Sequence, residues 1–421
     1  MSDTITSHPR PTYSISPRLY VMRTFLLLLL LQSLLLLPLP THSMSKVPKT
    51  LPKNLIVGYT TSKADTLASL EKVTEAIQNG VNVVIWSFIH LTTTTTTTKT
   101  TKTTKPVIQG GPNLTNLETY IQKLHQMGYE DTIHLAAFGG WNGPHLDTTF
   151  SPEDMYQAWV EYNTNNKVFD GFDWDLEGQD DVNGPNNVFT LEVLQAMGEM
   201  SRLAKLDGCL VSMAPAQSYL DMSTCNFSRR VNLTPHEPDW HPEFPYHGAN
   251  VYAYLLAKWG AYMDFICVQF YEGYSHANYQ ITRRNAAPST YVYDYVMQLK
   301  HQGQGYFVNF ENDPDLEMSN TTNQFVNVPM DKLVIGLANG WAVGSDKFLY
   351  MDPRDVGVAY ARLLEDDLDA SSSPPFRGFM FWVIEEEGTN DVHLASALND
   401  ILGDGSISSA GNKSSSIIID G

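Results

Sequence analysis

The chain has 421 residues, a formal net charge of −19 and 3 cysteines. Nucleic-acid binding depends on clustered Lys and Arg, so this charge argues against a nucleic-acid partner. The cysteine count excludes a disulfide-stapled framework, because at most one bridge can form, and Cys209 with Cys225 is the candidate pair. A chain of this length can instead bury a large hydrophobic core.

Residues 1–45 have the pattern of a secretory signal peptide with an extended n-region. Arg23 precedes an apolar run from Phe25 to Leu37, and Thr41-His42-Ser43 supplies small residues for a cleavage site. The run is shorter than the roughly 20 residues that a membrane-spanning helix needs. We therefore expect an extracellular protein with no stable membrane insertion after cleavage. An uncleaved signal anchor is the alternative, and Met22 is an alternative start of the chain.

Sequons of the form Asn-x-Ser/Thr agree with export and predict a glycoprotein. They occur at Asn113, Asn226, Asn232, Asn320 and Asn412.

From residue 55 onward, apolar β-branched runs alternate with helix-like stretches. We predict strands at 55–59, 81–88, 132–138, 170–177, 209–213, 264–271, 333–338 and 378–383. We predict helices between them at 66–78, 116–127, 152–162, 192–205, 249–260, 291–302 and 355–364. Such alternation indicates parallel strands with helical crossovers, and this number of units is that of a (β/α)8 TIM barrel. We expect one α/β barrel domain over residues 46–403.

Two segments of this region have low complexity. The threonine-rich stretch 92–105 follows the second strand, and we expect it to be a disordered loop insertion. Residues 404–421 form a low-complexity tail. The connection 339–377 is short, so we expect no large α+β insertion between the seventh and eighth strands.

The most informative segment is Asp170–Glu177, which reads DGFDWDLE. Side chains alternate along a strand, so Asp173, Asp175 and Glu177 share one face. Crowded carboxylates raise one another's pKa, and a glutamic acid that keeps its proton near neutral pH is a general acid. A calcium loop is the alternative, but the large apolar residues between the acids favour a strand. We predict no metal.

This segment resembles the D-G-x-D-x-D-x-E signature of glycoside hydrolase family 18, the chitinase family. Four further elements agree with that family in order and position: Phe138-Gly139-Gly140, Met213-Ala214-Pro215, Gln269-Phe270-Tyr271 and Met380-Phe381-Trp382. The chain departs from the family at Ala137, where Ser is usual, and at Glu272, where Asn or Asp is common.

The resemblance implies substrate-assisted hydrolysis at N-acetylglucosamine, with no cofactor. Glu177 would protonate the glycosidic oxygen, and Asp175 would orient the acetamido nitrogen. Asp173 would exchange charge with Asp175, and Tyr271 would hold the acetyl oxygen. The remaining substrate-binding candidates are Trp382, Gln269, Met213, Tyr59, Phe88 and Trp141. Asp170 is equally compatible with a structural and a catalytic role.

The resemblance implies a chitinase acting on β-1,4-linked N-acetylglucosamine polymers. With the signal segment we expect it to be secreted, and we expect a monomer. Two alternatives remain open. One is an endo-β-N-acetylglucosaminidase that cuts N-glycans with the same acidic residues. The other is a non-catalytic carbohydrate-binding protein on the same barrel, which the departures at Ala137 and Glu272 keep open.

Overall fold

The computed structural model describes residues 49–66, 68–97, 102–164, 167–181, 183–231, 250–273, 275–311, 313–316, 323–366 and 374–404. All of them belong to one unit, Ser45–Gly421. The expected signal segment and the tail beyond residue 404 lie outside the described residues, as do the sequons at Asn232, Asn320 and Asn412.

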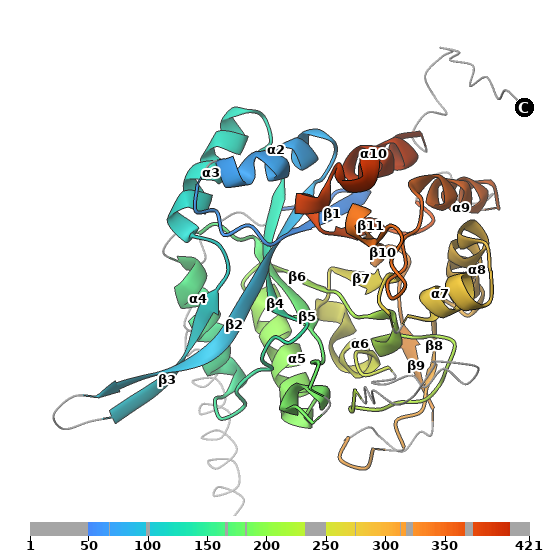
Figure 1. Cartoon of the computed structure of the whole chain (residues 1–421). Coiled ribbons are helices and arrows are strands. Elements are labelled where there is room, and N and C mark those ends of the chain that lie inside the picture. Colours follow the sequence, from blue (N-terminus) through green and yellow to red (C-terminus); the bar gives the residue numbers. More distant parts are fainter. Residues whose placement is uncertain are drawn as a thin grey trace, which may run out of the picture. The chain divides into compact units, whose positions relative to one another are not determined.

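Parallel strands close into a ring (Figure 1). In chain order they are β1 (Leu55–Thr60), β2 (Val83–Thr97), β4 (Ile133–Gly140), β5 (Gly171–Leu176), β6 (Leu210–Met213), β7 (Phe265–Gln269), β10 (Leu333–Ala338) and β11 (Gly378–Trp382). Each strand pairs with the next, and β11 pairs with β1. The TIM-barrel-like α/β fold expected from the alternating pattern is confirmed.

Helices surround the ring on its outside (Figure 1). They are α2 (Glu71–Gln78), α3 (Leu114–Gln126), α4 (Pro152–Thr164), α5 (Leu191–Leu206), α6 (Ala253–Trp259), α8 (Pro288–His301), α9 (Pro353–Asp366) and α10 (Leu394–Asp404). In α3, the buried residues Leu117, Tyr120, Ile121 and Leu124 recur at helical spacing and make one apolar face. Helix α10 was not predicted. None of the described helices is long and apolar enough to cross a membrane.

Apolar side chains fill the ring beneath the acidic residues of β5. Strand alternation directs Val57, Ile85, Leu135 and Cys267 inward from four different strands, and all are fully buried. Burying one aliphatic side chain of this kind stabilises a fold by roughly 1.5–3 kcal/mol. This packed layer forms the floor on which the acidic residues of β5 lie.

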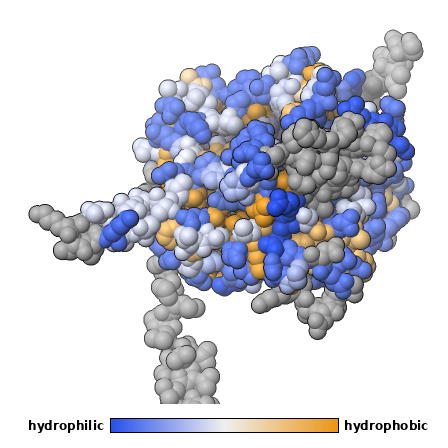
Figure 2. Space-filling model, turned by 60° about the horizontal axis from the view of Figure 1, so that its bottom comes forward, coloured by the Kyte–Doolittle hydropathy of each residue, from blue (hydrophilic) through white to orange (hydrophobic). Residues whose placement is uncertain are grey.

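The threonine-rich segment is not disordered where the structure describes it. Strand β2 continues to Thr97 and pairs antiparallel with β3 (Lys102–Gly110), from Ile89 opposite Gly110 to Thr97 opposite Lys102. This ribbon projects away from the ring in Figure 1, and it is the pale projection in Figure 2. We call residues 92–97 and 102–105 the threonine arm. The prediction was wrong because β-branched threonine suits a pleated ladder, which here continues a barrel strand.

The predicted Cys209–Cys225 bridge was also wrong, because all three cysteines are free. Cys209 lies just before β6, whereas Cys225 lies in the loop beyond the opposite end of that strand. The strand therefore holds the two thiols apart. Cys225 is exposed, and Cys209 and Cys267 are buried.

The connections after β7 and β10 differ in content. After β7 come the short α7 (His276–Asn278), helix α8, and an unpredicted antiparallel hairpin of β8 (Gly305–Val308) and β9 (Gln324–Asn327). Between β10 and β11, the described residues form the short η6 (Gly340–Ala342) and α9.

Candidate active site

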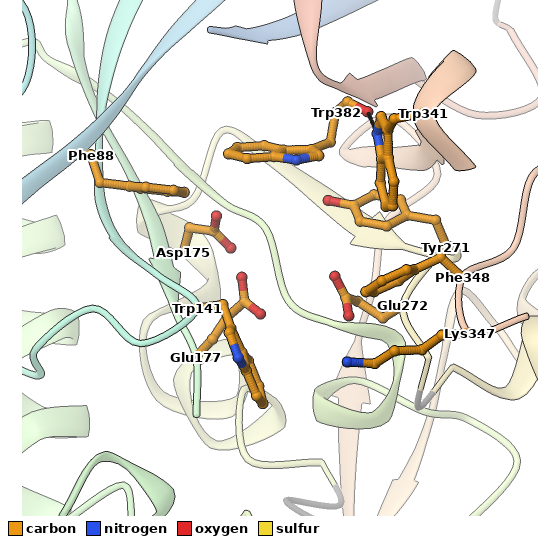
Figure 3. Close-up of a pocket in the computed structure, with 10 residues that line it drawn as sticks. All are labelled: Phe88, Trp141, Asp175, Glu177, Tyr271, Glu272, Trp341, Lys347, Phe348 and Trp382. Carbon is orange, nitrogen blue, oxygen red and sulfur yellow. Dashed lines mark hydrogen bonds between the residues drawn. The ribbon is translucent and has the colours of Figure 1, made fainter. Parts of the chain in front are cut away.

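A pocket of about 350 Å³ opens at the carboxyl ends of the ring strands (Figure 3). Its walls come from β2 near the end of its pairing with β4, from the ends of β4, β5, β7, β10 and β11, and from the loops that follow these five strands. The lining residues are Phe88, Trp141, Asp175, Glu177, Tyr271, Glu272, Trp341, Lys347, Phe348 and Trp382. In this fold, active sites are found at this end of the strands.

Strand β5 alternates as its sequence predicted. Asp173 is opposite Ala137 of β4 and Ser212 of β6 on the inner face of the ring. Trp174 points the other way, where its Nε1–H donates to Ser201 Oγ of α5 at 2.8 Å. Asp175 and Glu177 reach the pocket, and Asp173 lies beneath them with no exposed surface.

Two hydroxyl groups hold Asp173. Tyr59 Oη donates to Asp173 Oδ2 at 2.6 Å, and Ser212 Oγ donates to Asp173 Oδ1 at 2.5 Å. These bonds favour the charged form, but burial opposes it more strongly and raises the pKa of Asp173 to about 6. Asp173 can therefore change its charge near neutral pH.

Asp175 and Glu177 lie close enough to each other and to Glu272 for their charges to interact. Gln269 Nε2 donates to Asp175 Oδ1 at 2.9 Å, while burial, and next the charge of Glu177, raise the pKa of Asp175 well above its usual value. Burial and the charge of Glu272 raise the pKa of Glu177 to about 8. Figure 3 shows both carboxyl groups projecting into the pocket, where the raised pKa of Glu177 favours its protonated form.

The backbone of residues 176–178 is fixed by three side chains. Tyr252 Oη donates to the carbonyl oxygen of Leu176 at 2.9 Å, and His145 Nε2 donates to the carbonyl oxygen of Glu177 at 2.8 Å. Tyr219 Oη accepts from the amide of Gly178 at 3.2 Å. These contacts hold the acid in place before substrate arrives. Sequence reasoning missed His145 and Tyr252, which belong to no short motif.

Gly139 and Gly140 have a steric role at the end of β4. Both have positive φ, +111° and +82°. A Cβ on Gly139 would lie 2.4 Å from the Asp175 carbonyl oxygen, and one on Gly140 would lie 2.4 Å from the Phe88 ring. Glycine therefore allows both the acid strand and Phe88 to approach.

Three aromatic residues position the Trp382 indole. Its ring stacks on Phe88 at 5.6 Å and 17°, and lies 5.6 Å from the ring of Tyr59. Trp341 Nε1 donates to the Trp382 carbonyl at 2.7 Å, the dashed line in Figure 3. The exposed part of the indole faces the pocket, where an aromatic face can pack on the apolar face of a sugar ring.

Trp141 stands on the wall next to Glu177 (Figure 3). Its Nε1–H donates to Asp180 Oδ1 at 2.9 Å, and Asn142 Nδ2 donates to the other oxygen at 2.8 Å. The loop after β5 thus fixes the orientation of this indole.

Glu272 and Lys347 put opposite charges on the far wall. Glu272 is half-buried, and its pKa is raised to about 7 because burial outweighs the attraction of Lys347. Lys347 Nζ lies 4.9 Å from the centre of the Phe348 ring. Sequence reasoning missed Lys347 and Phe348 as site residues. They follow Trp341 in the loop after β10, but no motif marks them.

Three other predicted site residues, Tyr59, Gln269 and Met213, do not line the pocket. Tyr59 and Gln269 are buried beneath the pocket, where they contact Asp173 and Asp175. Met213 is opposite Trp174, so it lies on the helix-facing side of β6 and does not line the pocket. The Met213 assignment was wrong because the pairing of β6 with β5 places Ser212 opposite Asp173, so that Ser212 and not Met213 takes the inward face.

Asp170 lies at the opposite end of β5. Its Oδ2 accepts from the His134 amide at 2.9 Å and lies 3.5 Å from Lys49 Nζ. These contacts support the structural role. In the described part of the chain, no group of three or more His, Cys, Asp or Glu side chains could hold a metal ion.

Comparisons with known proteins gave structural matches only. No family model and no curated protein matches the chain. It is similar in structure to a family GH18 chitinase from Chromobacterium violaceum, with a TM-score of 0.53, 15% identity and 85% of each chain covered. This likeness shows the shared fold.

Two further solved structures match. One is a GH18 chitinase from Pseudoalteromonas aurantia, with a TM-score of 0.46, 15% identity, and coverage of 83% of this chain and 99% of that one. The other is a fungal endo-β-N-acetylglucosaminidase from family 18, with a TM-score of 0.47, 13% identity, and coverage of 85% and 96%.

Proposed function

We propose that this protein is a secreted, monomeric glycoside hydrolase of family 18. It cleaves β-1,4-linked N-acetylglucosamine polymers by substrate-assisted hydrolysis with retention of configuration. The observation that carries the proposal is the carboxyl group of Glu177. It projects into an aromatic-lined pocket at the carboxyl end of the ring, and its pKa is raised to about 8.

Glu177 acts first as the general acid. It gives its proton to the glycosidic oxygen as the bond from that oxygen to the anomeric carbon breaks. The carbonyl oxygen of the substrate's own acetamido group attacks the anomeric carbon and forms an oxazolinium intermediate. Trp382 supplies the floor under the sugar ring, and the Tyr271 hydroxyl positions the acetyl oxygen.

Asp175 and Asp173 balance the charge that develops on the acetamido nitrogen. Asp175 accepts the hydrogen bond from this nitrogen, and the negative charge or proton is exchanged with Asp173 below it. Glu177, now a carboxylate, removes a proton from water, which attacks the anomeric carbon from the side the leaving group vacated. Two inversions at one carbon give net retention.

An endo-β-N-acetylglucosaminidase acting on N-glycans is the second candidate, because the same acids would serve it. A non-catalytic carbohydrate-binding protein is the third. The negative charge of Glu272 beside Tyr271 is the feature that favours it, because the acetyl oxygen would have to bind near a carboxylate.

The test compares wild type with Glu177→Gln on labelled N-acetylglucosamine oligomers and on a high-mannose glycopeptide. We expect oligomer cleavage by wild type and a loss of about 10²–10⁴-fold in the variant. Glu75→Gln, an exposed position on α2, is the matched control and should keep full activity.

Each other outcome selects an alternative. Equal rates for wild type and Glu177→Gln would overturn the general-acid role. Cleavage of the glycopeptide alone would favour the endoglycosidase. Oligomer binding with no turnover of either substrate would favour the carbohydrate-binding protein.

A further inference from the structure

We propose that Ser212 of β6 is a positioning residue of this site. Its hydroxyl holds the Asp173 carboxylate from the side of β6. On the side of β4 the chain carries Ala137, which has no hydroxyl to do so. The inference deepens the proposed function and rests on it for its effect on catalysis.

The two neighbours of Asp173 in the sheet are unlike each other. Asp173 is opposite Ala137 on β4 and opposite Ser212 on β6. In parallel strands, residues opposite each other point to the same face, so both side chains point into the ring with Asp173. The Ala137 methyl group cannot donate a hydrogen bond, whereas Ser212 Oγ donates to Asp173 Oδ1 at 2.5 Å.

Each carboxylate oxygen of Asp173 thus has one hydroxyl donor. Tyr59 Oη donates to Oδ2 at 2.6 Å, and Ser212 Oγ donates to Oδ1. Asp173 and Ser212 have no exposed surface and Tyr59 has 1%, so bulk water does not replace a lost donor. A buried carboxylate without a donor is strongly disfavoured relative to its neutral form.

The consequence for catalysis follows from the charge that Asp173 must accept. Without the Ser212 hydroxyl, Asp173 holds its proton to higher pH and cannot exchange charge with Asp175. Asp173 does not line the pocket, so substrate affinity is affected less than turnover. Loss of Ser212 should therefore lower kcat, with little change in KM.

The experiment measures kcat and KM from pH 4 to 9 for wild type, Ser212→Ala and the double variant Ser212→Ala/Ala137→Ser. In Ser212→Ala we expect the acidic limb of the kcat profile to move to higher pH by about one unit. At pH 6 this corresponds to roughly a fivefold loss of kcat, which approaches about tenfold at lower pH. The double variant returns a hydroxyl to Asp173 from β4 and should recover most of this loss.

Ser201→Ala is the matched control. It removes a buried hydroxyl of the same size that contacts Trp174 rather than Asp173. A merely structural role for Ser212 predicts that Ser212→Ala and Ser201→Ala lower stability alike and leave the acidic limb in place. That result, or no recovery in the double variant, would overturn the inference.

A readout without turnover separates this inference from the proposed function. Carbon-13 NMR of protein labelled at the aspartate carboxyl groups, with Asp173→Asn for assignment, follows the titration of Asp173 directly. An upward shift in Ser212→Ala that is reversed in the double variant supports the positioning role, even if wild type cleaves no glycan. An unchanged titration refutes it.

If Ser212→Ala does not fold, Ser212→Cys replaces it in the same measurement. A thiol is a weak donor, so the titration of Asp173 should shift upward by a smaller amount. A cysteine variant whose Asp173 titrates as in wild type would overturn the inference.

Discussion

At the scale of single residues, the pocket is governed by the number of carboxyl groups crowded into it. Asp175, Glu177 and Glu272 line the same cavity, with Lys347 as the cation among its lining residues. Burial is the largest cause of the raised pKa of Glu177, and the charge of Glu272 is the next. Glu272, which follows Gln269-Phe270-Tyr271 and departs from the family pattern, therefore helps the general acid to keep its proton.

Replacing Glu272 by Gln should lower the pKa of Glu177, because a negative neighbour that favours the protonated form is removed. A general acid must be protonated to act, so the alkaline limb of the kcat/KM profile should move to lower pH, by about one unit. Glu75→Gln removes an exposed charge and serves as the control. An alkaline limb that stays in place, or moves to higher pH, would contradict this account.

At the scale of elements, β2 has a buried part within the ring and an exposed part in the threonine arm. Its first residues, Val83–Ser87, are buried between neighbouring ring strands, and the far end of the threonine arm is exposed. Leu91 lies at the base of the arm and is only 4% exposed, opposite Ile108 of β3. The stability of the ring should therefore depend on the base of the arm and not on its tip.

Replacing residues 95–104 by a short Asn-Gly turn should change the free energy of unfolding by less than about 0.5 kcal/mol, since the removed side chains that the structure describes are exposed. Leu91→Ala, by contrast, should cost about 2–4 kcal/mol, because it empties a buried site. Urea denaturation of both variants tests the contrast. A truncation as damaging as Leu91→Ala would mean that the tip supports the ring.

At the scale of the whole molecule, the site carries a stability cost. Buried acids with raised pKa values hold protons in the folded state that the unfolded chain has already released. For Glu177 this difference in bound protons exists over the pH range from its ordinary pKa of 4.5 to its raised pKa of about 8. Within it the unfolded state binds fewer protons, so the stability of the folded protein falls as pH rises.

Glu177→Gln removes this titration and should therefore stabilise the protein increasingly between pH 4.5 and 8. The gain should be below about 1 kcal/mol at pH 5 and roughly 4 kcal/mol at pH 8. Denaturant melts of both proteins at the two pH values measure it. A variant that is less stable than wild type at pH 8 would show that the carboxyl group stabilises the fold.

The sequence by itself determined what depends on near neighbours along the chain. Alternation within Asp170–Glu177 predicted which acids share the inner face, and the spacing of apolar runs predicted the ring strands and most of their helices. Both follow from the period of the backbone, which a few adjacent residues reveal.

Only the tertiary structure decided which distant side chains meet. Tyr59 and Ser212 contact Asp173 from 114 and 39 residues away, and Lys347 enters the pocket from a loop that no motif marks. The inward turn of Ser212 rather than Met213 depends on the pairing of β6 with β5. Folding brings these groups together through sheet register and loop paths, which no local pattern encodes.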